Sequence, residues 1–502
     1  MKPEDFEELV DKGFNLVEAT KMGYAEIRGK DGKTYWITEK QPLNPAMVTD
    51  LYEFTMMADY IESGRADEIG TFQGFYRKNP FEGGFGLTAG LNEVLDYLEQ
   101  LQFTGRDIDH MRKQWKMPES LYEYLREAEF NGTVEALPEG TMSQPHIPII
   151  QVTGPLPIAN FVETHILNQI GYPTMVITKA ARIALQGSEP YLEFGLRRAP
   201  SIDAANKASR AAYIGGAAGT SNVAAELIYG IPARGTMAHS LVMAFPTQRE
   251  AFRSYADIFR EESVFLIDTY GYESGVRDAI AVAKELGLKT FKGVRDDSGD
   301  LAYQSKIIRR ILDENGFQNA QIMVSNEIDE YVRRSLREQG AERDMDGIGE
   351  KLVTPPSSGL VYKLVQIGDR PVIKVSRSGK TTDPGRKKLC RFVENGYYAG
   401  DVMLMYDEEL GDEITAIRRS SDYETKRFSG EVIYPLVTVF ENGKRIYQTP
   451  HIDDIKQNVL HELSMMWPEI QRLENPAKYF IWLSPELNRI KKELIKEHPI
   501  RR

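Results

Sequence analysis

The sequence predicts an α/β fold with a parallel sheet, for which a barrel is the simplest closed form and an open doubly wound sheet is the alternative. Three observations predict it. Strand-like and helix-like segments alternate through the middle third of the chain. Polar clusters follow the apolar runs, where the active sites of parallel α/β proteins lie. The flanking regions lack this alternation. The pattern is that of an enzyme.

The elements of the middle third follow one another in a regular order. Apolar runs predict strands over 264–268, 290–294, 321–324 and 345–353, and a further strand over 228–233 that ends before Gly235. Helical periodicity predicts helices over 223–229, 276–286, 301–314 and 330–339, and another helix begins near Asp50. Asp300 is a candidate N-cap, and Asn315-Gly316 is a helix stop.

Composition limits the function classes. The 502 residues suffice for about two to three domains, and 41% hydrophobic with 27% charged residues is typical of a globular enzyme. A net charge of −12 argues against nucleic-acid binding. The single cysteine, Cys390, fits a reducing compartment, and we find neither a signal peptide nor an apolar run of about 20 residues. These features predict a cytoplasmic protein without a membrane partner.

The first candidate site is Gly235-Thr236-Met237-Ala238-His239-Ser240. At a strand exit, this segment offers backbone N–H groups, a hydroxyl and an imidazole. Histidine titrates near neutrality, so His239 can act as a base, an acid or a nucleophile. On its own the hexapeptide is weak evidence, because most histidines do no chemistry.

The densest polar cluster is Arg295-Asp296-Asp297-Ser298-Gly299-Asp300. Arginine binds carboxylates or phosphates with two parallel bonds, and a Ser-Gly turn lets backbone amides approach an anion. Asp297 can orient ribose hydroxyls or stabilise positive charge at a sugar carbon. A solvated turn that caps the next helix is the alternative reading.

Other strand exits are ambiguous one by one. Ser325-Asn326 and Gly219-Thr220-Ser221-Asn222 are also good helix caps, and Gly347-Ile348-Gly349 is also an ordinary turn. The segment 193–198 pairs Phe194 with two arginines, while Tyr52 defaults to core packing. No metal motif is present, and the six other histidines have no ligand-like spacing. Taken together, the residues at the ends of these strands are suited to binding a sugar that carries two phosphate groups.

Seven ordered segments closely resemble the nicotinate phosphoribosyltransferase family. They lie between Thr49 and Val375 and read TDLYEFTM, FYRKNPFEGGFGLTAGL, EFGLRRA, SRAAYIGGAAGTSN, GTMAHS, GVRDDSGDL and VYKLV. The resemblance implies an incomplete TIM-like α/β barrel of the type II phosphoribosyltransferases and a second α+β domain from both chain ends. The implied boundaries are 1–155 and 375–502 for the second domain and 156–374 for the barrel. It also implies a homodimer with active sites at the interface.

The implied reaction joins nicotinate to 5-phosphoribosyl 1-diphosphate, giving nicotinate mononucleotide and diphosphate. By resemblance, the pyridine ring is sandwiched between Phe194 of one chain and Tyr52 of the partner chain. Thr236 and Arg295 hold its carboxylate. Asp268 and Asp297 face the ribose. The phosphates are bound by residues of several loops, namely Arg197, Ser298, Gly299, Ser325, Gly347 and Gly349.

His239 matches the histidine that family members phosphorylate with ATP, so ATP is implied as a co-substrate. Mg²⁺ is expected to enter with the diphosphate and ATP rather than in a protein cage. Ser221 stands where the related nicotinamide enzyme has an aspartate. Because an aspartate there repels a carboxylate, Ser221 favours nicotinate as the base.

Three positions depart from the family pattern. Glu350 replaces a threonine that contacts the phosphoribosyl group, so we expect it to point away or the loop to differ. Ser358 interrupts a common glycine pair. Asp296 replaces an apolar residue, and we expect its charge to weaken the grip of Arg295 on an anion. The alternative functions are a nicotinamide enzyme, a barrel sugar-phosphate isomerase or lyase, and a catalytically silent binding protein.

Overall fold

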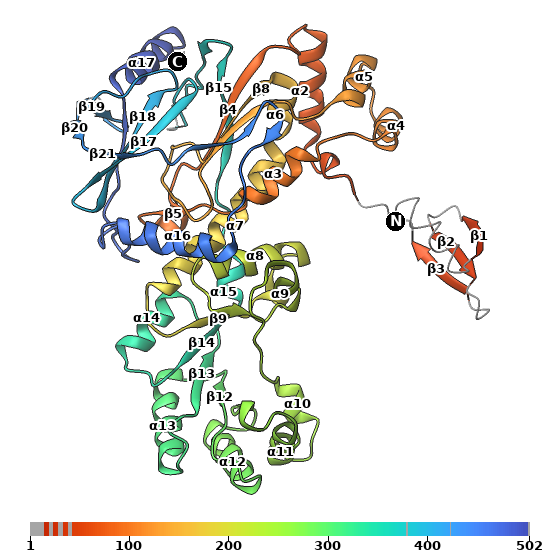
Figure 1. The fold of residues 1–502 in the computed structure, drawn as a ribbon, viewed down its shortest axis with the longest axis vertical. Helices are drawn as coiled ribbons and strands as arrows, with labels where there is room; N and C mark the ends of the chain where they lie inside the picture. The colour runs from red at the N-terminus through yellow and green to blue at the C-terminus, as the bar shows by residue number, and fades with distance from the viewer. Residues whose placement is uncertain are drawn as a thin grey trace.

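The computed structural model describes residues 43–377, 380–421 and 423–499, and the backbone of three short strands near the N-terminus. These strands form an antiparallel sheet in the order β1 (Asn15–Ala19), β2 (Tyr24–Arg28), β3 (Thr34–Thr38). Residues 43–499 form two lobes, drawn one above the other in Figure 1. The lower lobe contains the alternating segments of the sequence.

The lower lobe is built on a parallel sheet of six short strands. Every ladder in it is parallel. Next to β10, the chain makes one further parallel bridge, from Ala233 to Thr220. The strand order is β10 (Gly219–Thr220), β9 (Tyr191–Glu193), β14 (Met345–Ile348), β13 (Gln321–Ser325), β12 (Gly293–Asp296), β11 (Val264–Leu266).

Helices connect these strands. The helix predicted over 301–314 is confirmed, and the Asp300 side chain accepts a hydrogen bond from the Tyr303 N–H (3.1 Å), as expected of an N-cap. The helices of the lower lobe are α8 (Ile202–Ile214), α9 (Val223–Tyr229), α10 (His239–Met243), α11 (Gln248–Phe259), α12 (Tyr272–Glu285), α13 (Leu301–Glu314), α14 (Glu330–Glu338) and α15 (Glu350–Val353).

Two predicted strands are wrong in part. The run 345–353 is a strand only to Ile348, because Gly349 begins a turn and residues 350–353 form α15. The run 228–233 starts inside helix α9 and contributes only the bridge at Ala233. Both runs are short, and periodicity alone does not assign a short run to strand or helix.

The upper lobe contains two mixed or antiparallel sheets. Residues 361–371, placed with the barrel by the sequence, pair with β4 in the first sheet. The first sheet has the order β16 (Arg370–Pro371), β15 (Val361–Ile367), β4 (Ile69–Phe75), β8 (Ile150–Pro155), β6 (Thr133–Ala136), β22 (Val437–Glu441), β23 (Lys444–Arg445). The second has the order β20 (Thr425–Ser429), β19 (Glu413–Arg418), β24 (Ile481–Leu483), β18 (Tyr397–Met405), β17 (Lys387–Glu394), β21 (Glu431–Ile433).

A long helix, α7 (Glu163–Ala184), joins the lobes. It packs against α8 of the lower lobe and α3 of the upper one. Strands β5 (Gly86–Leu87) and β7 (Met142–Ser143) form a small separate ladder. The remaining helices are α2 (Leu51–Glu62), α3 (Leu91–Glu99), α4 (Gly105–Gln114), α5 (Glu119–Glu127), α6 (Leu156–Phe161), α16 (Ile452–Met465) and α17 (Pro485–Glu497), with 3-10 turns at 45–47, 80–82, 196–198 and 260–262.

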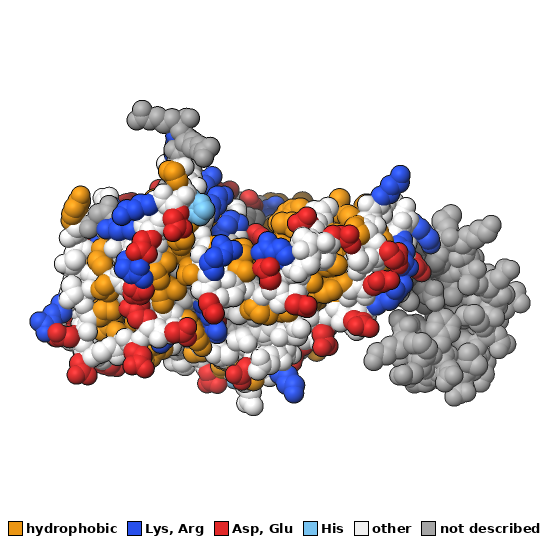
Figure 2. All heavy atoms as spheres, turned by 90° about the horizontal axis from the view of Figure 1, so that it is seen from above, with side chains coloured by type: hydrophobic (Ala, Val, Ile, Leu, Met, Phe, Trp, Pro, Cys, Tyr) orange, Lys and Arg blue, Asp and Glu red, His pale blue; other side chains and the backbone are white. Residues whose placement is uncertain are grey.

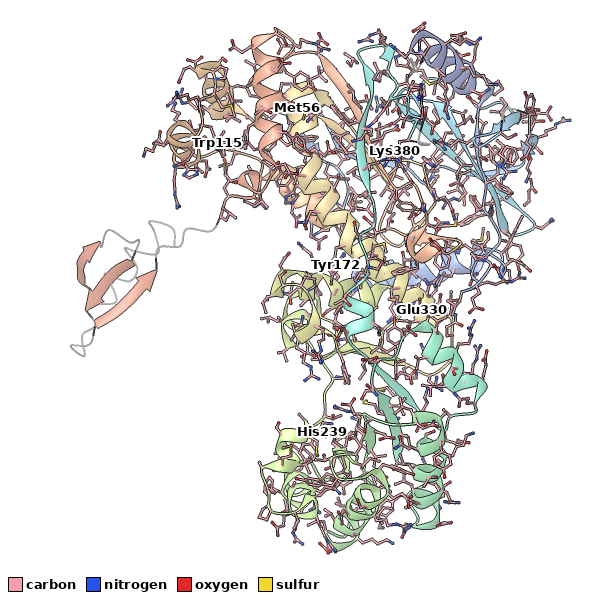
Figure 3. The ribbon with its side chains drawn as sticks, turned by 180° about the vertical axis from the view of Figure 1, so that it is seen from behind. Met56, Trp115, Tyr172, His239, Glu330 and Lys380 are labelled. Atoms are coloured by element: carbon pink, nitrogen blue, oxygen red, sulfur yellow. The ribbon has the colours of Figure 1, made fainter. Side chains whose placement is uncertain are left out.

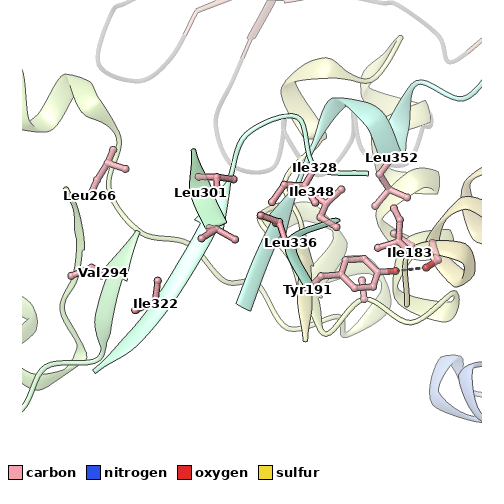
Figure 4. Close-up of a cluster of buried hydrophobic side chains, with 14 of the residues drawn as sticks. Ile183, Tyr191, Leu266, Val294, Leu301, Ile322, Ile328, Leu336, Ile348 and Leu352 are labelled. Carbon is pink, nitrogen blue, oxygen red and sulfur yellow. Dashed lines mark hydrogen bonds between the residues drawn. The ribbon is translucent and has the colours of Figure 1, made fainter. Parts of the chain in front are cut away.

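Fully buried aliphatic side chains hold the parallel sheet to its helices. One residue from each of four adjacent strands lies in this core: Leu266, Val294, Ile322 and Ile348 (Figure 4). Burying each contributes about 1.5–3 kcal/mol. The Tyr191 hydroxyl donates to the Ala180 carbonyl (3.0 Å), which ties β9 to α7. This core fixes the strand ends that carry the polar residues.

Charges are mixed on the surface. In Figure 2, acidic and basic side chains alternate with small apolar patches over one end of the molecule, without a continuous basic stripe among the described residues. Among the helices of the described residues, none is both long and apolar enough to cross a membrane.

Candidate active site at the carboxyl ends of the parallel strands

A cavity of about 530 Å³ lies at the carboxyl ends of the parallel strands. Its walls come from the exits of β9, β10, β12, β13 and β14 and from the segment 235–238. Ten residues singled out from the sequence line it: Phe194, Arg197, Ser221, Thr236, Arg295, Asp297, Ser325, Gly347, Gly349 and Glu350. Segments separated by more than a hundred residues therefore meet at one opening.

Arg295 spans one wall of this cavity. Its guanidinium donates to Thr236 Oγ1 (2.8 Å) and to the Met237 carbonyl (3.4 Å), and it approaches Asp297 Oδ2 (3.4 Å). The side chain is 15% exposed, and its Nε has no hydrogen-bond partner in the structure. The guanidinium is thus fixed in place and retains capacity to bind an anion in the cavity.

His239 begins α10 and faces two carboxylates. Its Nε2 lies 3.7 Å from Asp297 Oδ2 and 4.0 Å from Asp268 Oδ1, while Nδ1 lies 3.0 Å from Thr269 Oγ1. The imidazole is 39% exposed. Arg295 and His239 therefore approach the same carboxylate, that of Asp297.

A serine hydroxyl forms a hydrogen bond with each of these two carboxylates. Ser298 Oγ donates to Asp268 Oδ2 (2.6 Å), and Ser325 Oγ hydrogen-bonds Asp297 Oδ1. Asp268 Oδ1 is buried and has no hydrogen-bond partner in the structure. Ser298 reaches the site through this hydrogen bond, and neither Ser298 nor Gly299 lines the cavity. Thr269 was not singled out from the sequence. Its position directly after Asp268, at the end of a predicted strand, could have marked it as a candidate site residue.

Asp296 is a buried acid next to the site. Its side chain is fully buried, and neither carboxylate oxygen has a hydrogen-bond partner. Burial, and then the charges of Asp268 and Asp297, raise its pKa to about 7. The acid that contacts Arg295 is Asp297, and a weaker grip of Arg295 on an anion through the charge of Asp296 stays a prediction.

Two glycines make room for an aromatic ring. A Cβ at Gly347 would lie 2.8 Å from the Phe194 ring, and one at Gly349 would lie 3.1 Å from the Phe194 carbonyl oxygen. The Phe194 N–H donates to the Ile348 carbonyl (2.7 Å). Phe194 is therefore packed against the glycine loop and presents its remaining surface to the cavity.

Glu350 lines the cavity, contrary to the expectation that it points away. Its carboxylate lies 3.5 Å from the Arg198 Nε, and both side chains are more than half exposed. Arg198 thus offsets part of the Glu350 charge at the rim. Arg197, its neighbour, also lines the cavity.

A buried glutamate organises the neighbouring exits. Glu193, which the sequence reasoning left unassigned, accepts from the Thr220 hydroxyl (2.6 Å), the Ser209 hydroxyl (2.9 Å) and the Gly195 N–H. Burial raises its pKa. The Ser221 N–H donates to the Glu193 carbonyl (2.9 Å), which sets Ser221 at the cavity edge. The sequence could have indicated this role, because Glu193 is a glutamate flanked by apolar residues in a strand.

Tyr52 lies outside this cavity. It is on α2 in the upper lobe, as is Met56, which Figure 3 shows at the end of the molecule opposite His239. Its side chain is 46% exposed, and burial of its hydroxyl together with Glu163 and Glu53 raises its pKa to about 12. Across the described ranges, no set of three or more His, Cys, Asp or Glu side chains is arranged to hold a metal ion.

Family models match three parts of the chain. Residues 47–171 match the nicotinate phosphoribosyltransferase (NAPRTase) N-terminal domain, residues 191–330 the NAPRTase family, and residues 386–491 the nicotinate phosphoribosyltransferase C-terminal domain. The matched ranges cover most of both lobes and include the cavity residues up to Glu327.

Curated relatives cover nearly the same span. The chain is 40% identical over 457 residues to nicotinate phosphoribosyltransferase of Bacillus subtilis (strain 168), covering 87% of this chain and 92% of that one. It is 32% identical over 510 residues to the human enzyme of the same name, covering 88% and 95%.

Solved structures agree with this. The crystal structure of human nicotinic acid phosphoribosyltransferase superposes with a TM-score of 0.81 at 29% identity, covering 89% of this chain and 99% of that chain. A nicotinate-nucleotide pyrophosphorylase from Pyrococcus furiosus shares the fold, with a TM-score of 0.66 at 23% identity over 86% and 98% of the chains.

Proposed function

The chain belongs to the nicotinate phosphoribosyltransferase family, and from this premise we infer that it joins nicotinate to 5-phosphoribosyl 1-diphosphate. The products are nicotinate mononucleotide and diphosphate, a step of NAD biosynthesis. The observation that carries the inference is that Arg295 and Asp297 line one cavity of about 530 Å³, while the His239 imidazole lies 3.7 Å from the Asp297 carboxylate. A cavity of this size suits a small aromatic acid beside a phosphorylated pentose.

The proposed chemistry forms one bond and breaks one. The pyridine nitrogen attacks the sugar C1, and the C1–O bond to diphosphate breaks with its electron pair. Positive charge develops at the sugar during this exchange, so the carboxylates of Asp297 and Asp268 stabilise it. Arg295, fixed by Thr236, holds the nicotinate carboxylate, and Phe194 packs against the ring. The protein mainly positions the reactants.

Phosphate binding is assigned in this proposal to other residues of the cavity wall. Arg197 lines the cavity there, and the glycine loop 347–349 leaves space for a close approach of backbone to phosphate. Ser325 lies between this loop and Asp297. The Arg198–Glu350 pair supports the proposal only at the rim, where it limits repulsion between Glu350 and an anion.

We further propose that ATP phosphorylates His239 and that hydrolysis of the phosphoimidazole drives turnover. A proton on Nδ1, donated to Thr269 Oγ1, leaves the Nε2 lone pair for attack on the γ-phosphorus of ATP, with ADP as the leaving group. Mg²⁺ enters with ATP and diphosphate and screens their charge. The unpartnered Asp268 Oδ1 fits a contact to such an ion or its waters.

The proposed architecture is an incomplete barrel in a homodimer. Support for the barrel comes from the six parallel strands and from the bridge that brings Ala233 beside β10. Support for the dimer comes from Tyr52, which is exposed on α2 of the upper lobe and does not line its own chain's cavity. The free, buried thiol of Cys390 supports a cytoplasmic location.

One assay tests both parts of the proposal. The purified chain is supplied with 5-phosphoribosyl 1-diphosphate and either nicotinate or nicotinamide, with and without ATP, and product is measured by chromatography. We expect nicotinate to be used and ATP to stimulate turnover. His239→Ala should lose the ATP stimulation, and full stimulation in that variant would remove the phosphohistidine step while leaving the transferase activity in place.

A further inference from the structure

A second cavity lies at the opposite ends of the same strands. Its volume is about 180 Å³, and residues that begin β11, β12, β13 and β14 line it: Val264, Gly293, Gln321 and Met345. The active-site cavity and this one share Gly235 and Thr236 as a common wall. A molecule in the second cavity would therefore sit behind the loop that holds Arg295.

Much of the wall of the second cavity is apolar, with Thr236 and Gln321 as polar members. Leu192 and Val294 are almost completely buried, and Met323 and Met345 are partly buried beside them. Apolar cavities of about 150 Å³ take up a single benzene ring. A cavity of about 180 Å³ thus has room for one six-membered ring and a small substituent.

The mouth of the cavity is basic. Lys292 is paired with Glu262 (2.7 Å), so the two charges offset each other. The Arg234 guanidinium donates only to the adjacent Ala233 carbonyl (2.9 Å), and no described carboxylate lies within ion-pair distance of it. The guanidinium at this mouth is left to bind an anion, with the bidentate geometry that suits a carboxylate.

We propose that this second cavity is a binding site for a small, planar aromatic carboxylate of one ring. The ring lies between Leu192 and Met323, and the carboxylate binds Arg234. The site is separate from the active-site cavity and does not depend on turnover. It places a molecule of the same chemical class as the base substrate against the rear of Thr236.

The first experiment locates a probe. Crystals of the full chain are soaked with 4-bromobenzoate, and the bromine is located by anomalous scattering. We expect a bromine peak between Leu192 and Met323. A peak found only in the active-site cavity, or no peak, overturns the proposal whether or not the transferase activity is confirmed.

The second experiment measures binding in solution by calorimetric titration of the full chain with benzoate. Arg234→Gln removes the cation, and Ala218→Phe fills the mouth of the cavity. Each variant should weaken one benzoate-binding event at least tenfold. The matched control Arg310→Gln, an exposed arginine on α13, should bind as the unmodified chain does. Benzamide, which has the same shape without the charge, should bind at least tenfold more weakly to the unmodified chain. Unchanged benzoate binding in both cavity variants would overturn the proposal.

Discussion

Individual residues of the site are fixed by bonds that sequence spacing does not display. Asp297 receives the Ser325 hydroxyl, approaches Arg295 and faces His239, and these four residues come from three different segments. Sequence reasoning supplied the residue types and their positions at strand exits. It could not supply which carboxylate each cation meets, because that depends on strand order.

At the residue scale, Asp296 is expected to cost stability in a pH-dependent manner. Its pKa is raised from 3.8 to about 7, so the native state holds this proton between those pH values while the unfolded state releases it. Stability from this group is therefore lost as pH rises from about 4 to 7, by on the order of 3 to 4 kcal/mol. Asp296→Leu should raise the free energy of unfolding more at pH 8 than at pH 5, as measured by urea denaturation.

The comparison of the variant with the unmodified chain at each pH isolates this carboxyl from all others. An equal gain at pH 5 and pH 8 would mean that packing of the leucine, and not the charge, accounts for the effect. Asp296→Asn is the matched polar control and should remove the pH dependence with less gain in packing.

Ser221 carries a second prediction at this scale, about base choice. Ser221→Asp places a negative charge at the cavity edge, where it repels the nicotinate carboxylate by roughly 1 to 2 kcal/mol. We expect kcat/KM for nicotinate to fall about tenfold while nicotinamide is less affected, in side-by-side steady-state assays. Ser221→Asn adds bulk without charge and serves as the control. An unchanged ratio in the Asp variant would show that base choice is set elsewhere.

At the scale of elements, the strand exits were the most predictable part of the molecule. Four parallel strands and the helix 301–314 follow from apolar runs and caps, because βα repetition is a local pattern. The end of β14 was not predicted, since residues 350–353 are too few to show a helical period and only Gly349 marks the turn. The order of strands in the sheets of the upper lobe was not predicted either, because some of their pairs, such as β15 with β4 and β22 with β6, join segments hundreds of residues apart.

The glycine loop after β14 gives a prediction at the element scale. Gly347→Ala puts a Cβ 2.8 Å from the Phe194 ring, so the ring or the loop must move. We expect KM for nicotinate to rise several-fold and stability to fall by about 1 to 3 kcal/mol. Thermal unfolding and steady-state kinetics measure the two effects.

Gly105→Ala is the matched control for this substitution. A Cβ there meets no atom within 4 Å, and the position is the first of helix α4, so stability should be unchanged or slightly higher. Similar losses in both variants would show that the Phe194 contact is not the cause.

At the scale of the whole molecule, the two lobes hold different parts of the proposed site. The cavity lies in the lower lobe, while Tyr52 lies on α2 of the upper one. If two chains pair head to tail, each active site takes its tyrosine from the other chain. A single chain then contains every required side chain and still lacks a complete site.

Complementation tests this arrangement. His239→Ala and Tyr52→Ala chains, carrying different affinity tags, are co-expressed, and the doubly tagged dimer is isolated. One of its two sites receives both substitutions and the other receives neither, so we expect about half of the unmodified dimer's activity. Each parent homodimer should be strongly impaired. Activity no higher than that of the parents would show that Tyr52 serves its own chain's site.

The seven-stranded sheet has a consequence for how the chain is made. Strand β6, near residue 134, finds its partner β22 only after residue 437 has left the ribosome. Until then one edge of the nascent sheet is open to other chains, whereas the βα units between 191 and 353 can fold as they emerge. A ribosome that stalls before the last hundred codons would thus release a product whose βα half is intact and whose open strand edge invites aggregation.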